Sequence, residues 1–169
     1  MPRLWLRSSH RRVRTQPFQL VKKTILLADD DASIRTMVGR VLESENYNVI
    51  FAGSGREAAL RFMAGPPHLV LLDLNMPDKD GWEAWRLMSF WQRLVPVIVI
   101  TARSHQYEQA LQSKVDALME KPLDLHLLLE TIQRLLAESN AAHAARLSDP
   151  HFKTALLNAP ALANAKINS

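Results

Sequence analysis

An apolar run that ends abruptly in a carboxylate constrains this chain more than any other feature. Leu69 to Leu72 are four consecutive apolar residues, and Asp73 closes the run directly before a turn-rich segment that ends at Gly81. A short apolar run between turn signals indicates a strand buried on both faces, as in a parallel sheet covered by helices. An acid at the carboxyl end of such a strand lies where open α/β sheets hold their sites.

Similar short apolar runs alternate with segments of helical periodicity along the middle of the chain. The expected strands are 24–28, 48–52, 69–73, 96–101 and 117–120. The expected helices are 33–44, 54–64, 82–91, 104–113 and 125–136. Alternating strands and helices with crossovers of about 20 residues predict a parallel sheet with helices on both of its faces.

The two ends of the chain differ in composition from this body. Residues 1–23 hold seven of the 21 Lys and Arg residues and no acid, so the remaining 146 residues carry 14 basic and 17 acidic side chains and a net charge of −3. We expect 1–23 to be a disordered basic extension, with an anionic partner or organelle targeting as alternatives. Residues 24–139 form the expected domain. Residues 140–169 are Ala- and Asn-rich and too few to bury a core of their own, so we expect a flexible tail with at most a short helix near 152–158.

Composition excludes several classes of protein. The chain has no Cys, so disulfides and thiol chemistry are excluded, which is compatible with a reducing compartment. No apolar run approaches the roughly 18 residues that a membrane span needs. We therefore expect a cytoplasmic protein without membrane insertion, whose mildly acidic body does not bind nucleic acid directly.

Polar groups stand at the carboxyl ends of four expected strands. Asp29 and Asp30 follow the first strand, Asp73 ends the third, Thr101 ends the fourth and Lys121 follows the fifth. Taken singly, these residues are ordinary: acids cap helices, Thr favours strands, and a Lys before Pro is usually exposed. The carboxyl ends of parallel strands share one edge of the sheet, however, so the sequence predicts that the five side chains converge.

Converging carboxylates point to a metal and to phosphate. Crowded acids raise one another's pKa unless a cation neutralises them, and Mg²⁺ is typically bound by one or two carboxylates together with water and phosphate. With the metal bound, Asp73 can attack phosphorus as a nucleophile. Lys121 would balance charge on the transferring oxygens, and Thr101 would offer its hydroxyl to one of them.

These residues resemble the receiver domain of bacterial two-component response regulators, such as the chemotaxis regulator. The similarity extends over residues 22–138. It rests on Ile25 to Asp31 (ILLADDD), Leu71 to Gly81 (LLDLNMPDKDG), Ile100 to Ala102 (ITA) and Glu120 to Pro122 (EKP), in the order and near the spacing of the family. The resemblance implies a flavodoxin-like sheet of five parallel strands in the order 2-1-3-4-5.

The family's site residues carry over by position. The resemblance implies that Asp73 accepts a phosphoryl group from a sensor histidine kinase or a histidine phosphotransfer protein. It also implies a Mg²⁺ site. Asp30 would bind the ion directly and Asp29 through water, and Asp73 and the backbone carbonyl of Asn75 would complete the protein ligands. Asp31 lies one place beyond the acidic pair and is left out of the metal shell.

Further roles follow from the same resemblance. Thr101 would be the hydroxyl that moves toward the aspartyl phosphate, and Lys121 would pair with the phosphoryl group. The bond between Lys121 and Pro122 is expected to be cis, an isomer confined almost entirely to proline. Asn75 and Arg103 occupy the positions at which the family tunes the lifetime of the phosphoryl group.

The chain departs from the family at two places near the last expected strand. Leu118 stands where many receivers have an aromatic residue that swings inward with the Thr, so coupling to the output face is expected to be altered. Lys114-Val115-Asp116 replaces a common Gly-Ala-Asp sequence, so a turn that favours Gly must be built differently. The expected partner face is formed by 104–113, 117–120 and the helix that begins at Leu125.

Three function classes follow from these residues. The first is a single-domain receiver that catalyses only its own phosphorylation and dephosphorylation, since no DNA-binding or enzymatic module fits in 140–169. The second is a haloacid-dehalogenase-like phosphatase, which would need an acid at the position of Asn75. The third is an interaction module of receiver fold that works without phosphate, an alternative kept open by Leu118. None of the His residues shows ligand spacing.

Overall fold

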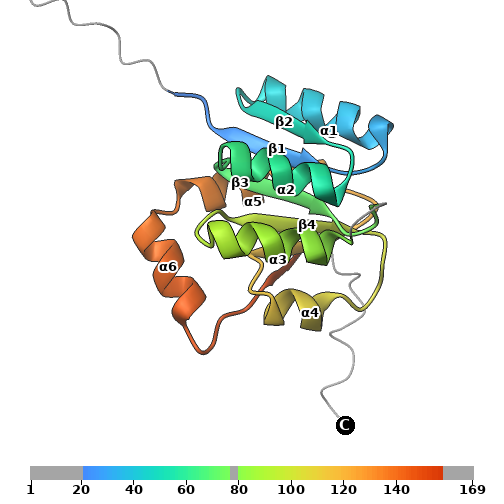
Figure 1. Ribbon diagram of the computed structural model, residues 1–169. Coiled ribbons are helices and arrows are strands. Elements are labelled where there is room, and N and C mark those ends of the chain that lie inside the picture. Colours follow the sequence, from blue (N-terminus) through green and yellow to red (C-terminus); the bar gives the residue numbers. More distant parts are fainter. Residues whose placement is uncertain (1–20, 77–79, 158–169) are drawn as a thin grey trace, which may run out of the picture.

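The computed structural model describes residues 21–76 and 80–157 (Figure 1). A parallel sheet of six strands lies at its centre, in the order β2-β1-β3-β4-β5-β6. The strands are β1 (Thr24–Ala28), β2 (Asn48–Ala52), β3 (Leu69–Asp73), β4 (Val97–Thr101), β5 (Ala117–Glu120) and β6 (Ala155–Leu157). The parallel α/β fold and the order of the first five strands are therefore confirmed, and a sixth strand extends the sheet.

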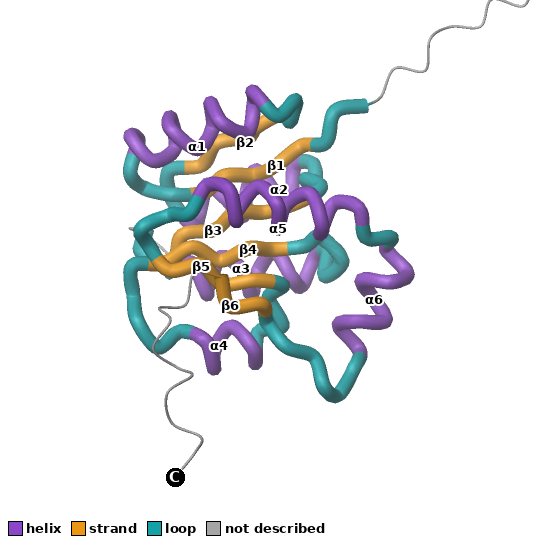
Figure 2. The backbone as a smooth tube through the Cα atoms, turned by 180° about the vertical axis from the view of Figure 1, so that it is seen from behind, coloured by secondary structure: helices purple, strands orange, loops and turns teal. Residues whose placement is uncertain are grey.

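Within the described ranges, six helices accompany the sheet. They are α1 (Ala32–Ser44), α2 (Gly55–Ala64), α3 (Gly81–Trp91), α4 (Tyr107–Gln112), α5 (Leu125–Ala137) and α6 (Asn140–Ser148). Helices α2, α3 and α4 lie on one face and α1 and α5 on the other, whereas α6 stands beside the end of the sheet at which the strands begin (Figures 1 and 2). None of the helices in the described ranges is long and apolar enough to cross a membrane.

The alternation of side chains along each strand divides the core into two layers. In β3, Val70 and Leu72 pack on the side of α2 and α3, whereas Leu69 and Leu71 pack on the side of α1 and α5. All four side chains are fully buried. The apolar run is uninterrupted because both faces of the strand are covered, as the sequence predicted.

Side-chain caps fix where the helices begin. The Asp31 carboxylate accepts a hydrogen bond from the Ser33 backbone N–H at 2.8 Å at the start of α1. At α2 the hydroxyl of Ser54 accepts from the Glu57 N–H at 3.2 Å, while the Glu57 carboxylate accepts from the Gly53 N–H at 2.9 Å. These bonds satisfy donors that a helix leaves free at its first turn.

The expectation of a flexible tail from residue 140 is wrong for residues 140–157. This segment forms α6 and β6, and β6 pairs in parallel with β5 over Ala155 to Leu157. His143, Leu147, Phe152 and Leu157 are buried. The segment needs no core of its own because it adds apolar side chains to the existing core and a strand to the existing sheet. Residues 158–169, like 1–20, lie outside the described residues.

Candidate functional site

The carboxyl ends of β1 and β3 bring three acids together. Asp29 follows β1, Asp73 ends β3, and both carboxylates are buried, each residue being 1 % exposed. Asp30 is exposed at the rim. One carboxylate oxygen from each of these three residues lies within 4.8 Å of the others. The predicted convergence of the acids is thus present in the structure.

Lys121 joins the acids from the end of β5. Its Nζ donates to Asp73 Oδ2 at 2.8 Å and to Asp29 Oδ2 at 2.9 Å. The Lys121 side chain is 19 % exposed, so this ion pair lies mostly away from water. The peptide bond between Lys121 and Pro122 is cis, as expected.

Burial and charge act in opposite directions on these groups. Burial raises the pKa of Asp29, and the nearby charge of Asp73 adds to this effect, while the hydrogen bond from Lys121 works against it. Burial also opposes the charged form of Lys121, but its hydrogen bonds to Asp73 and Asp29 outweigh burial and raise its pKa. The single ammonium of Lys121 offsets only part of the negative charge of the three carboxylates, which leaves negative charge for a cation to balance.

The donors at this site fit a hard divalent cation. Carboxylate oxygens and carbonyl groups are the ligands that Mg²⁺ prefers. The backbone N–H of Asn75 donates to Asp73 Oδ1 at 2.9 Å, which holds the turn after β3 against the carboxylate. The side-chain Oδ1 of Asn75 is buried without a hydrogen-bond partner among the described residues. A buried oxygen of this kind is costly unless a donor or a cation approaches it.

Thr101 follows Ile100, the residue of β4 that pairs with Asp73 in the sheet, and its hydroxyl is hydrogen-bonded to another group. It ends β4, is fully buried, and its Oγ1 accepts from the backbone N–H of Arg103 at 2.9 Å. The Arg103 guanidinium in turn pairs with Asp80 at 3.2 Å, where both side chains are about half exposed. Among the described residues, Thr101 is thus placed next to the acidic pocket and tied to the β4–α4 loop.

Gly81 lets the start of α3 approach the end of β3. A Cβ built on Gly81 would lie 2.4 Å from the backbone oxygen of Asp73 and 2.7 Å from the Cα of Leu74. Both neighbours are backbone atoms, which cannot turn aside as a flexible side chain can. Any other residue at this position must therefore push the Asp73 backbone away from α3.

We expect Gly81→Ala to lower the free energy of unfolding by about 1–3 kcal/mol, the usual cost of overpacking. Urea unfolding of the full chain measures this effect. Gly65→Ala is the matched control, because a Cβ on Gly65 would meet no atom within 4 Å. Equal unfolding midpoints for the two variants would contradict the proposed close approach.

The two departures from the family pattern have clear structural consequences. Lys114 itself adopts the left-handed conformation, with φ of 52°, in the turn that commonly uses Gly. Leu118 is 1 % exposed and packs within the core on the side of α2, α3 and α4. At this position the described structure therefore has a buried aliphatic side chain in place of an aromatic ring.

Sequence reasoning missed a second charged cluster at the opposite end of the sheet. It consists of Asp116, Glu138, His143 and Arg146, and we call it the Asp116 cluster. Asp116 Oδ1 accepts from His143 Nε2 at 2.8 Å and from Arg146 Nη2 at 2.6 Å. Spacing along the chain gives no signal for it, because its members come from three separate segments.

Comparison with known proteins shows similarity to response regulators. A family model for the response regulator receiver domain matches residues 25–133. Response regulator RR06 of Streptococcus pneumoniae is 36% identical over 114 residues, which make up 66% of this chain and 52% of RR06. The alkaline phosphatase synthesis transcriptional regulatory protein PhoP of Bacillus subtilis is 29% identical over 124 residues, 72% of this chain and 52% of PhoP.

Solved structures extend the likeness to three dimensions. A CheY-like response regulator receiver domain protein from Methanospirillum hungatei matches with a TM-score of 0.64 and 29% identity, covering 68% of this chain and 94% of that one. TrrA of Thermotoga maritima, crystallised in complex with Mg²⁺ and BeF, matches with a TM-score of 0.63 and 30% identity, covering 67% and 98%.

Helix α6 and strand β6 lie outside the part of the chain that the family model matches. The family match ends at residue 133, before α6 begins at Asn140. The chain spans about half the length of the curated relatives it matches, whereas it covers nearly all of the two receiver structures. Helix α6 and strand β6 are therefore additions beyond the matched domain.

Proposed function

Because this chain belongs to the family of response regulator receiver domains, we propose that Asp73 accepts a phosphoryl group from a sensor histidine kinase or a histidine phosphotransfer protein. The observation that carries the proposal is the pair of hydrogen bonds from Lys121 to Asp73 and Asp29. They join the ends of three strands into one buried charged cluster. Receiver domains are signalling modules rather than enzymes with an external substrate, so the only reaction proposed is on the chain itself.

The transfer can be written on named atoms. A carboxylate oxygen of Asp73 forms a bond to phosphorus while the bond from phosphorus to the donor's imidazole nitrogen breaks, and the released imidazole takes a proton from solvent. Lys121 lies close enough to offset negative charge on the phosphoryl oxygens. The Thr101 hydroxyl would leave the Arg103 N–H and donate to one of these oxygens.

Mg²⁺ is proposed as the cofactor of this step. Asp29, Asp30 and Asp73, with the backbone carbonyl of Asn75, would hold it. When bound, it supplies positive charge against the phosphate oxygens. In this chain the three carboxylates are already gathered, so little rearrangement is needed before the cation binds.

The output is proposed to pass to a protein partner at the face of α4, β5 and α5. Thr101 gives this route a starting point, since its hydroxyl holds the N–H of Arg103 in the loop before α4. Movement of the hydroxyl toward a phosphoryl oxygen would release that loop. The buried Leu118 makes this loop, rather than a swinging aromatic ring, the proposed carrier of the signal.

The test is phosphorylation of the full chain by acetyl phosphate with Mg²⁺ or with EDTA. We expect the protein to gain the mass of one phosphoryl group, which is labile to acid and to hydroxylamine, with Mg²⁺ and to gain none with EDTA, because the acyl phosphate forms only when the carboxylate charge is offset. Asp73→Asn should abolish the gain. The matched control is Asp31→Asn, since Asp31 caps α1 outside the cluster and Asn is an equally good cap.

One observation favours a second class, an interaction module that works without phosphate. Leu118 has no aromatic ring that could swing as in many receivers, and its side chain is buried in the core. That class would be supported if wild type and Asp73→Asn both failed to gain a phosphoryl group while remaining folded. Asn75 stands where a haloacid-dehalogenase-like phosphatase needs an acid, which leaves the phosphatase alternative without its leaving-group acid.

A further inference from the structure

Strand β6 occupies the outer edge of β5. Ala155, Leu156 and Leu157 pair in parallel with Ala117, Leu118 and Met119, and Figure 2 shows the two strands side by side. Leu157 also joins the buried cluster on the side of α1 and α5. The backbone groups of β5 that would face a partner are therefore already paired within the chain.

The Asp116 cluster ties this strand and α6 to the body of the domain. Asp116 Oδ2 accepts from the backbone N–H of Val97 at 2.8 Å, and the backbone oxygen of Asp116 accepts from Ala155 at 3.0 Å. Its other carboxylate oxygen binds His143 and Arg146 of α6. One buried residue thus connects β4, β6 and α6.

Further contacts hold α6 and the segment between α6 and β6 against the domain. Arg146 also pairs with Glu138 at the end of α5, at 2.7 Å. The ring of Phe152 is near two cations, with its centroid 5.7 Å from Lys114 Nζ and 5.8 Å from Arg146 Cζ. Lys114 also donates to the backbone oxygen of Leu147. Residues 140–157 are consequently held as one unit, which we call the cover.

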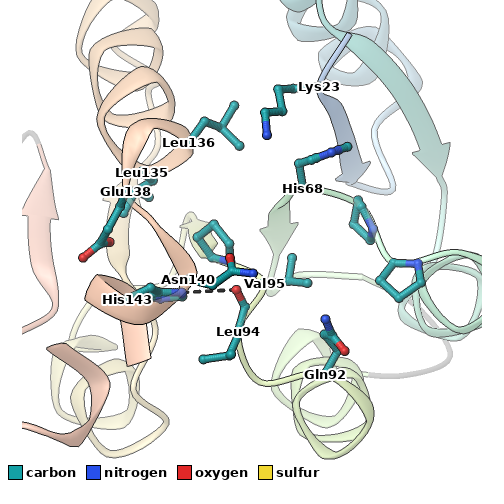
Figure 3. Close-up of a pocket in the computed structure, with 13 residues that line it drawn as sticks. Lys23, His68, Gln92, Leu94, Val95, Leu135, Leu136, Glu138, Asn140 and His143 are labelled. Atoms are coloured by element: carbon teal, nitrogen blue, oxygen red, sulfur yellow. Dashed lines mark hydrogen bonds between the residues drawn. The ribbon is translucent and has the colours of Figure 1, made fainter. Parts of the chain in front are cut away.

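The geometry of His143 indicates its protonation state. Its Nε2 faces the Asp116 carboxylate, and its Nδ1 lies 3.2 Å from the backbone oxygen of Leu94 (Figure 3). Both partners can only accept a hydrogen bond, so both ring nitrogens must donate, which only the imidazolium can do. The hydrogen bond that His143 donates to Asp116 accordingly raises the pKa of His143 above its ordinary value, against the opposing effect of burial.

Charged groups from several elements surround His143. Asp116 before β5 and Glu138 after α5 are the facing acids, and Arg146 on α6 is a facing cation. Lys23 and His68 line the same pocket as His143, and this pocket has a volume of about 220 Å³ (Figure 3). If His143 lost one of its two ring protons, either the Asp116 carboxylate or the backbone oxygen of Leu94 would lose its hydrogen bond from the ring.

We propose that residues 140–157 are a pH-gated cover over the β5 edge, which keeps the backbone groups of that edge paired within the chain while it is closed. Protonated His143 keeps the cover closed, and its deprotonation loosens α6 and releases β6. Because the pKa of His143 is raised in the folded chain, the stabilisation is fully present below 6.5 and is lost as the pH rises through the folded pKa. The cover can open whether or not Asp73 is phosphorylated.

Amide hydrogen exchange of the full chain, followed by NMR, tests this proposal. Protection factors, which already take account of the intrinsic effect of pH on exchange, are compared between Ala155 to Leu157 and Val70 to Leu72 in β3. The β3 residues report any change in the stability of the whole domain. Between about pH 6 and about pH 9 we expect protection in β6 to fall at least about tenfold while protection in β3 holds, since breaking a buried ion pair opens only the unit it anchors.

Two variants decide whether His143 is responsible. In His143→Gln, protection of Ala155 to Leu157 should be low and the same at both pH values. His126→Gln is the control, because His126 is an exposed residue of α5, and it should keep the full pH response. The proposal is overturned if β6 keeps its protection at high pH, if β3 loses protection in parallel, or if His143→Gln still shows the pH response.

Discussion

Replacing Lys121 by Met is expected to slow phosphorylation of Asp73 by acetyl phosphate about a hundredfold, the cost of removing one preorganised positive donor from a transferring group. The reason is the place of the ammonium, 2.8 Å from Asp73 and 2.9 Å from Asp29 in a mostly buried pocket. Met fills the space of the Lys stem without carrying its charge. The rate is measured from the gain of protein-bound phosphate at saturating Mg²⁺.

Lys153→Met provides the matched control for Lys121→Met. Lys153 is an exposed residue between Phe152 and Thr154, remote from the acidic pocket in the sequence and the fold. Its substitution should leave the phosphorylation rate unchanged. If the two variants were phosphorylated at the same rate, the ion pair of Lys121 would have no role in the transfer.

Replacing Asp116 by Ala is expected to lower the free energy of unfolding by about 3–5 kcal/mol, since removing one member of a buried ion pair leaves the others uncompensated. His143 and Arg146 would both lose their shared acceptor, and the backbone N–H of Val97 would lose its bond. Urea unfolding of the full chain below about pH 6, where His143 is charged, measures the loss.

The control for Asp116→Ala is an acid in an exposed pair. Glu130 lies 3.3 Å from His126 on the surface of α5, with 61% of its side chain exposed. Glu130→Ala should shift the unfolding midpoint little, because exposed ion pairs contribute little to stability. A similar shift for both substitutions would show that the Asp116 cluster does not anchor the cover.

Local signals made much of the fold predictable. Continuous apolar runs such as Leu69 to Leu72 identified the central strands because both of their faces are buried. The acids, Thr101 and Lys121 could be placed together because parallel strands end at one edge of the sheet. The ion pairs of Lys121 with Asp29 and Asp73 are the direct outcome of that rule.

The cover could not be predicted in the same way. A strand of three residues, Ala155 to Leu157, has too few positions to show periodicity, and its stability comes from β5 rather than from its own sequence. His143 looked incidental because its partners, Asp116 and the Leu94 carbonyl, lie 27 and 49 residues away. Charged clusters assembled from distant segments become visible only once the chain has folded.

The shortened helix α4 has a related explanation. Its expected range of 104–113 contracts to Tyr107–Gln112. The residues before it form a loop that Thr101 holds through the Arg103 N–H, while Trp82 Nε1 donates to the Gln106 side chain at 3.0 Å. Tertiary hydrogen bonds replace the first turn of the helix that propensity alone predicts.

Locating the phosphoryl group on the chain tests the central claim most directly. After phosphorylation with Mg²⁺, reduction of the acyl phosphate with borohydride converts the modified aspartate into homoserine, which peptide mass spectrometry assigns to one position. We predict homoserine at Asp73, with Asp29 and Asp30 unchanged. Homoserine at Asp30 with Asp73 intact, or label retained on a His, would contradict the assignment of Asp73 as the residue that carries the phosphoryl group.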